Sequence, residues 1–305
     1  MGLDGYLVGV LAAFLASFSW ALAAILYRKF LTGFSDPWIA NGLRAAPTFS
    51  FLLLMIFALK KFDDFYFSLL NSRILVIVFV ATIIAIVVGD TLYMVALRNV
   101  GVSIGYPISY MYPVFVAFLA SFILKEVITL TLIISLILAS LGVWLVSYKP
   151  PKQDITLEKR RLVLGVVSAI GTTVCWANAI IIFRISVKTS DPLAVDALKS
   201  MFLLFVFLPL LLVKFKEVKV NIDGKAFFIL SLGGILGIGV GDWFLYISLM
   251  EIGAARATAL TTSAPLLSLL LAVLVLKEKV SKRQILGTIL IIMGVILVSM
   301  MEVLR

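Results

Sequence analysis

Long apolar runs, each closed by charged or turn-forming residues, recur along the whole chain. A helix needs about twenty apolar residues to cross the hydrocarbon core of a bilayer. The pattern therefore predicts an all-α membrane protein with ten transmembrane helices. The predicted spans are residues 7–27, 37–59, 74–97, 103–124, 128–148, 162–184, 192–213, 226–250, 257–276 and 285–302.

The second half of the sequence repeats the first half. Motifs from the third predicted span onward return 152 residues later, and those near the start return at a slightly larger spacing. This divides the chain into a first repeat (residues 1–148), a basic linker (149–161) and a second repeat (162–305). Because five spans per repeat is an odd number, we expect two inverted five-helix repeats, with both termini on the same side of the membrane. The matched pairs include Val88-Gly89-Asp90 with Val240-Gly241-Asp242, Pro113 with Pro265, and Trp20 with Trp176.

The composition fits a membrane protein and argues against an enzyme. Hydrophobic residues make up 63% of the chain and charged residues 14%, whereas a soluble domain is about half apolar and about a quarter charged. The chain contains no histidine, and its single cysteine is Cys175. Disulfides, histidine zinc sites and Ser-His or Cys-His nucleophile pairs are therefore excluded. We expect no enzymatic activity, no metal and no cofactor.

Basic residues exceed acidic residues, giving a formal net charge of +10, and nearly all of them lie in the loops. No basic stripe is interleaved with aromatic residues, so nucleic-acid binding is disfavoured and the lipid bilayer is the expected partner. Loops that follow the odd-numbered spans hold sixteen basic residues, and the opposite loops and the C-terminus hold eight. The positive-inside rule then places the first set in the cytoplasm, and both termini outside the cell membrane.

Within each repeat, a series of short motifs runs from the third predicted span to the fifth. The first repeat has Gly89-Asp90 through Leu97, Gly101-Val102-Ser103, Pro113, Leu124-Lys125-Glu126 and Gly142-Val143, and the second has Gly241-Asp242 through Leu249, Gly253-Ala254-Ala255, Pro265, Leu276-Lys277-Glu278 and Gly294-Val295. This series, present twice, resembles the EamA domain of the drug/metabolite transporter superfamily. The resemblance implies ten helices in two inverted repeats, and export or exchange of small metabolites or drugs by alternating access. In its ten-helix sugar-nucleotide relatives both termini are expected in the cytosol, opposite to the orientation that the loop charges favour.

The Lys-Glu pair in this series falls at the ends of the fourth and ninth predicted spans. The two copies are Lys125-Glu126 and Lys277-Glu278. A charged pair at a helix end is usually solvated, so we expect no binding site at either copy.

Charged residues at membrane depth are costly and are expected to have a partner. Arg44 and Asp90 lie at the same predicted depth in the second and third spans, and Lys199 and Asp242 do so in the seventh and eighth. We interpret them as two intramembrane ion pairs that face the bundle interior, with Asp196 competing for Lys199 on the same helix face. We favour structural locks between neighbouring helices. The alternative is that one aspartate carries a coupling proton or pairs with a charged substrate.

Aromatic and polar residues deep within four spans predict a substrate cavity between the repeats. Glycine and proline interrupt the fourth span, and unwound backbone at membrane depth is tolerated where it lines a cavity. Packing is the alternative for the tryptophans, and helix–helix contact is the alternative for the threonine. The predicted cavity residues are Trp20, Tyr106, Tyr110, Trp176, Asn178 and Thr262.

These features predict a secondary transporter in the cell membrane. We expect it to export or exchange small, partly apolar metabolites such as amino acids by alternating access, with protons as a candidate coupling ion. The alternative function is a flippase or carrier of lipids or lipid-linked sugars, which needs a groove open to the bilayer. A monomer and a homodimer are both compatible with the sequence.

Overall fold

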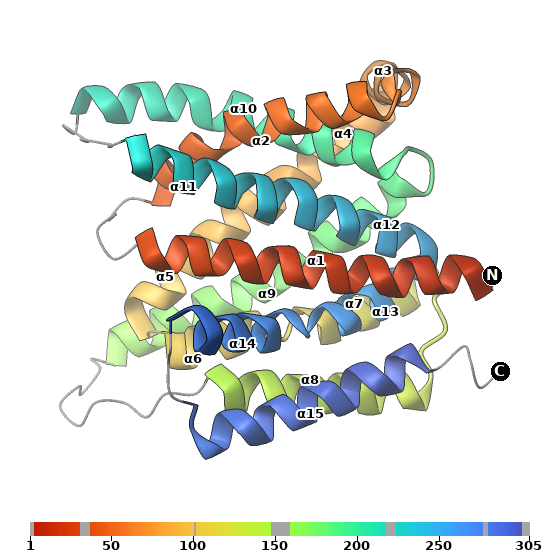
Figure 1. The fold of residues 1–305 in the computed structure, drawn as a ribbon, viewed down its shortest axis with the longest axis vertical. Helices are drawn as coiled ribbons and strands as arrows, with labels where there is room; N and C mark the ends of the chain where they lie inside the picture. Colours follow the sequence, from red (N-terminus) through yellow and green to blue (C-terminus); the bar gives the residue numbers. More distant parts are fainter. Residues whose placement is uncertain are drawn as a thin grey trace.

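The computed structural model describes residues 3–30, 37–100, 102–147, 159–217, 224–276 and 280–300. Within these ranges the chain is helical and contains no strand. Nine helices of the described part are long and apolar enough to cross a membrane. The long helices lie side by side along one direction (Figure 1).

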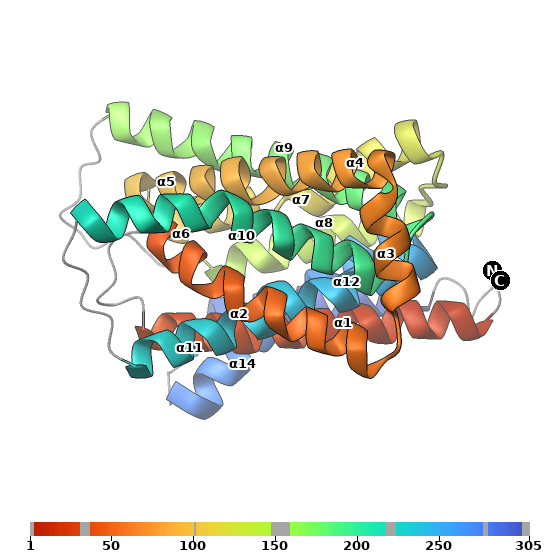
Figure 2. The same cartoon turned by 90° about the horizontal axis from the view of Figure 1, so that it is seen from above.

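The first half of the chain forms α1 to α8. The short helix α3 was not predicted, and it turns across the ends of the long helices (Figure 2). Asp63 and Asp64 lie in its first turn, where negative charge stabilises a helix. The elements are α1 (Leu3–Phe30), α2 (Pro37–Ala58), α3 (Phe62–Leu70), α4 (Ser72–Thr82), the π-helix η1 (Ile83–Asp90), α5 (Thr91–Val100), α6 (Val102–Ser109), α7 (Tyr112–Leu119), the π-helix η2 (Ala120–Leu124) and α8 (Leu130–Ser147).

The second half forms α9 to α15. Its third span, like that of the first half, combines two α-helical segments with a π-helical segment between them. The elements are α9 (Lys159–Val187), α10 (Pro192–Glu217), α11 (Gly224–Gly234), the π-helix η3 (Ile235–Gly241), α12 (Asp242–Ile252), α13 (Ala254–Thr261), α14 (Ala264–Leu276) and α15 (Lys282–Ser299).

The fourth predicted span, residues 103–124, is not one continuous helix. It is divided into α6 and α7 by a turn at Tyr110 and Met111, so only Tyr112–Leu124 remains as a shorter apolar helix. Pro113 lies in the first turn of α7, where its missing N–H is tolerated, whereas in a continuous helix it would leave the carbonyl oxygen of Ser109 without its partner. Among the described residues, nine helices are therefore long and apolar enough to cross a membrane, where the apolar pattern predicts ten.

The two halves of the chain are interleaved. Helix α1 packs against η3 and α12 of the second half, and α9 packs against η1 and α5 of the first half. Helices of equivalent position also pair with each other, α2 with α10 and α8 with α15. The main apolar core accordingly draws residues from both halves.

The structure describes only part of the predicted linker, and it brings the first and last helices together. Residues 149–158 of the predicted linker lie outside the described residues, and Lys159–Arg161 form the first turn of α9 instead of linker. They join the helix because no glycine or proline separates them from the apolar run that follows. Near the other end of the bundle, the Tyr6 hydroxyl donates to the carbonyl oxygen of Val298 at 2.6 Å. The start of α1 and the end of α15 therefore lie together, and the side of the membrane that they face stays a prediction.

Candidate functional site

Two tryptophans each donate a hydrogen bond to an aspartate of the opposite half. Trp20 Nε1 on α1 lies 3.0 Å from Asp242 Oδ1 at the start of α12. Trp176 Nε1 on α9 lies 3.0 Å from Asp90 Oδ1 at the end of η1. The repeated motifs thus form two equivalent contacts, each of which joins the first helix of one half to the third span of the other.

A glycine precedes each aspartate because the indole ring lies directly against the helix there. A Cβ atom at Gly241 would lie 2.5 Å from Trp20 Cδ1, and one at Gly89 would lie 3.0 Å from Trp176 Cδ1. Carbon atoms in contact are normally about 3.5–4.0 Å apart. In the repeated Gly-Asp pair, the glycine therefore admits the ring and the aspartate accepts its N–H.

Both aspartates lie at the C-terminal ends of π-helical segments. Segment η1 ends at Asp90, and η3 ends one residue before Asp242. Such turns are rare and often mark functional sites. Side chains of other helices bond to backbone carbonyl oxygens of these segments. The bonds are Ser19 Oγ to Leu236 (2.6 Å), Lys199 Nζ to Ile238 (3.0 Å) and Thr172 Oγ1 to Gly89 (3.3 Å).

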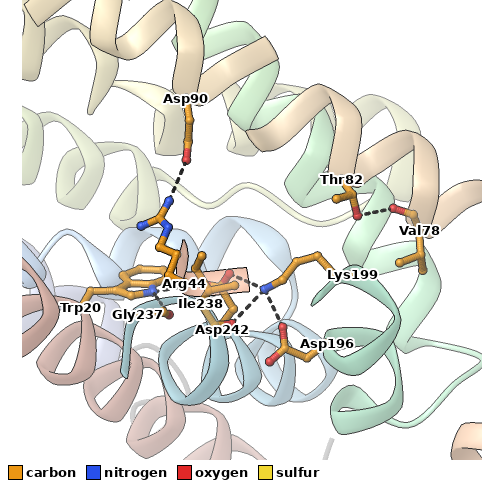
Figure 3. A network of polar contacts seen from close by, with 10 residues as sticks. All are labelled: Trp20, Arg44, Val78, Thr82, Asp90, Asp196, Lys199, Gly237, Ile238 and Asp242. Atoms are coloured by element: carbon orange, nitrogen blue, oxygen red, sulfur yellow. Dashed lines mark hydrogen bonds and ion pairs between the residues drawn. The ribbon is translucent and has the colours of Figure 1, made fainter. Parts of the chain in front are cut away.

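The carboxylate of the first half has a loose partner. Arg44 Nη2 on α2 lies 3.7 Å from Asp90 Oδ2, which is an ion-pair distance and longer than a hydrogen bond (Figure 3). The side chains of Arg44 and Asp90 are 14% and 23% exposed. The structure thus brings together the pair that equal depth predicted, and leaves part of the carboxylate accessible.

The carboxylate of the second half belongs to a tight group of three charges. Lys199 Nζ lies 2.5 Å from Asp242 Oδ2 and 2.5 Å from Asp196 Oδ1 (Figure 3). The side chains of Lys199 and Asp196 are 1% and 0% exposed. Asp196, considered from the sequence only as a competitor, therefore binds the lysine together with Asp242. Tyr246 adds a cation–π contact, its ring centroid 5.2 Å from the ammonium.

Four tyrosines gather around the Trp176 indole, and we call these five residues the aromatic cluster. The ring centroids of Tyr93, Tyr110 and Tyr112 lie 5.2, 5.9 and 5.9 Å from that of Trp176. Tyr106 stacks on Tyr110 with the centroids 4.0 Å apart. The structure thus joins three of the predicted cavity residues and adds Tyr93 and Tyr112. Tyr93 lies three residues after the aspartate of η1 and so on the same helix face, a spacing that could have identified it.

The other predicted cavity residues make different contacts. Trp20 lies against η3, where its Nε1 also reaches the Gly237 carbonyl oxygen at 3.1 Å. Asn178 Nδ2 donates to Val174 O within α9 at 2.8 Å, and Thr262 Oγ1, at the residue that follows α13, donates to Ala259 O of that helix at 2.6 Å. A role of Asn178 and Thr262 in substrate binding, and the cavity itself, stay predictions.

Glu126 is not the solvated helix-end residue that the sequence suggested. Its carboxylate accepts the N–H groups of Ala254 at 2.9 Å and Ala255 at 3.1 Å, at the start of α13 in the other half. Arg184 Nε lies 3.7 Å from the same carboxylate. Gly253, with φ of +86°, has no room for a side chain because a Cβ atom would lie 2.8 Å from Glu126 Oε1. The second copy of this motif lies outside the described residues.

Comparisons with known proteins agree with this architecture. The family model of the EamA-like transporter family matches residues 7–148 and again residues 163–300. An uncharacterized transporter of Archaeoglobus fulgidus is 26% identical over 291 residues, which cover 94% of this chain and 96% of the relative. A protein crystal structure has the same fold, with a TM-score of 0.76 at 18% identity over 95% of each chain. The expected resemblance is thus confirmed: the chain is a multi-pass membrane protein that belongs to the EamA-like transporter family.

Proposed function

We propose that this protein is a secondary transporter that exports or exchanges small, partly apolar metabolites such as amino acids by alternating access. Ten spans in two inverted repeats would form it, with α6, α7 and η2 together as the broken fourth span. The reciprocal Trp–Asp hydrogen bonds carry this proposal, because they tie each repeat to the carboxylate of the other. Motion of one repeat against the other therefore acts directly on both carboxylates.

The substrate site of the proposal lies at the Asp90 side of this seam. The Arg44–Asp90 pair offers both signs of charge, and its length of 3.7 Å lets a polar solute compete for either partner. The aromatic cluster beside it offers apolar ring surface, which substrate sites commonly use with a few polar groups. A small solute with charged and apolar parts, such as an amino acid, matches this combination. Asp90 is also the group that we propose for proton coupling.

Counterflow in proteoliposomes tests the proposal. Vesicles that hold purified protein are loaded with one member of an amino-acid and metabolite panel, and uptake of the same labelled compound is measured. We expect substrate-dependent uptake with the wild type and at least about a tenfold loss with Tyr110→Leu, which corresponds to about 1.4 kcal/mol of lost interaction. Tyr66→Leu, at an exposed tyrosine on α3, is the matched control and should retain uptake.

Two outcomes would contradict the proposal. Absence of uptake for every compound of the panel, with folded protein in the vesicles, would remove metabolite transport. Equal losses in Tyr110→Leu and Tyr66→Leu would remove the aromatic cluster from the site. A parallel assay with fluorescent phospholipid in the same vesicles separates the flippase alternative, which predicts lipid movement across the bilayer without metabolite uptake.

A further inference from the structure

Two arginines from opposite halves of the chain line one surface depression, which we call the arginine pocket. Its volume is about 570 Å³. Both arginines are exposed, and Arg98 makes no ion pair within the described ranges. The pocket lies outside the aspartate sites, at the end of the bundle where α5 ends and α9 begins. Its lining residues are Val95, Arg98, Asn99, Arg161 and Leu164.

The same helix crossing occurs at both ends of the molecule, which provides an internal comparison. At the pocket, α9 lies so close to α5 that a Cβ atom at Gly165 would come within 3.1 Å of Asn99 Cβ. At the other end, α1 lies equally close to α12, where a Cβ atom at Gly9 would lie 2.9 Å from Glu251 Cβ. Gly9 and Glu251 are the repeat counterparts of Gly165 and Asn99.

Only the α5–α9 crossing has arginines on both of the crossing helices; at the α1–α12 crossing, Arg184 of α9 reaches the Met250 carbonyl oxygen at 3.0 Å instead. The counterparts of Arg98 and Arg161 are Met250 and Gly5. A Cβ atom at Gly5 would lie 2.9 Å from Glu251 Oε2, so an acidic side chain occupies the equivalent place. The fold alone therefore does not require the two arginines. They also lie on the end of the molecule that has the excess of basic loop residues.

In the arginine pocket the charged groups lie nearer the membrane surface and the apolar side chains lie deeper, which is also the order of headgroup and acyl chains in a lipid. Helix α9 runs from Arg161 into the membrane, so Leu164 lies one turn deeper than the guanidinium. Helix α5 ends just after Arg98, so Val95 likewise lies deeper. One guanidinium group can donate two parallel hydrogen bonds to two oxygens of a phosphate. Basic pockets between transmembrane helices bind anionic lipid headgroups. We propose that the arginine pocket binds the phosphate headgroup of an anionic phospholipid, with Val95 and Leu164 against its glycerol and upper acyl chains.

Native mass spectrometry of the full chain in detergent tests this proposal, with phosphatidylglycerol as the probe. We expect the double variant Arg98→Gln with Arg161→Gln to bind the first phosphatidylglycerol about tenfold more weakly than the wild type. The matched control is Lys225→Gln with Lys282→Gln, which removes two exposed cations at the starts of α11 and α15, at the same end of the bundle (Figure 1). This control should bind like the wild type.

Further measurements distinguish binding of a lipid from binding of a soluble anion, and a lost binding site from a folding defect. Phosphatidylcholine should bind the wild type at least about fivefold more weakly than phosphatidylglycerol, and millimolar inorganic phosphate should leave the lipid bound. If the glutamine variant does not fold, the double variant Arg98→Lys with Arg161→Lys serves instead. It keeps both positive charges but lacks the planar guanidinium that donates two hydrogen bonds to one phosphate, so it should bind with intermediate affinity. Wild-type affinity in both double variants, or displacement of the lipid by inorganic phosphate, would overturn the proposal.

Discussion

Asp90 and Asp242 each accept a hydrogen bond from the tryptophan of the opposite half, but the cations beside them are held differently. Arg44 lies 3.7 Å from Asp90, with both side chains partly exposed. Lys199 lies 2.5 Å from Asp242 and is almost fully buried. Asp196 binds this lysine as well, whereas the repeat counterpart of Asp196 in the first half is Asn41.

The uncharged side chains around the two aspartates also differ. The first site has the aromatic cluster, and the counterparts of its tyrosines at the second site are aliphatic or hydroxyl side chains. These counterparts are Leu245, Thr258, Thr262 and Ala264. The duplicated frame of tryptophan, glycine and aspartate has thus been kept while its neighbours diverged. We interpret the second site as the structural lock and the first as the site that a solute can open.

Removal of the two cations should give the largest difference between the sites. Lys199→Met leaves Asp196 and Asp242 without their cation, and losing one partner of a buried ion pair costs about 3–5 kcal/mol. Arg44→Met should cost about 1 kcal/mol, because Asp90 is partly exposed and keeps its bond to Trp176. Unfolding in mixed micelles of a denaturing detergent measures both values. Equal losses would contradict the assignment of the lock.

The glycines should reveal how tightly each tryptophan is packed. Gly241→Ala forces a Cβ atom against Trp20 at 2.5 Å, and Gly89→Ala one against Trp176 at 3.0 Å. Overpacking costs about 1–3 kcal/mol, and we expect Gly241→Ala at the upper end of this range and Gly89→Ala at the lower. Melting temperatures of the purified variants check the order. Gly224→Ala is the control, since among the described residues outside its own helix turn no atom lies within 4 Å of the added methyl group.

Neutralising each aspartate should separate transport from stability. Asp90→Asn keeps the shape of the site and removes the charge, so we expect uptake to fall at least about tenfold, with a melting temperature close to that of the wild type. Asp242→Asn should instead lower the melting temperature, because Lys199 loses a charged partner. A normal transport rate and normal pH dependence in a folded Asp90→Asn protein would return Asp90 to a purely structural role.

An ion pair outside the membrane provides the smallest expected effect and a baseline for the other pairs. Lys61 lies 3.0 Å from Asp191, and this hydrogen bond, followed by that to Asp64, raises the pKa of the lysine above its ordinary 10.5. Its stabilisation is therefore present below about pH 10.5 and is lost as the pH rises through the raised pKa. Solvent screening limits it to about 0.5 kcal/mol. Lys61→Gln should lower the melting temperature slightly at pH 8, and not in high salt or at pH 12.

Much of the fold could be predicted from apolar runs, because the bilayer demands a long apolar helix at each crossing. The broken fourth span shows the limit, since the apolar run continues through the turn at Tyr110 and Met111. Helix α3 was missed because it is too short to cross and lies at the ends of the bundle. The family could be identified because two copies of the same motifs keep their spacing.

The site was harder to predict because it depends on contacts between distant helices. Equal depth identified Arg44 with Asp90 and Lys199 with Asp242, since each pair lies on neighbouring spans of one half. The spacing of the repeats gave no information on which half a side chain contacts. The hydrogen bond of Trp176 to Asp90, and the capping of α13 by Glu126, could therefore not be predicted from the sequence.

Because the two halves are interleaved, the first helix is synthesised long before the residues that it contacts in the folded protein. Helix α1 leaves the ribosome first, but the carboxylate that accepts the Trp20 N–H is encoded 222 residues later. Until then α1 must persist alone in the bilayer, which its internally bonded backbone and apolar side chains allow. Two polypeptides separated within residues 149–158 should for the same reason reach the native state only when they are synthesised in the same cell.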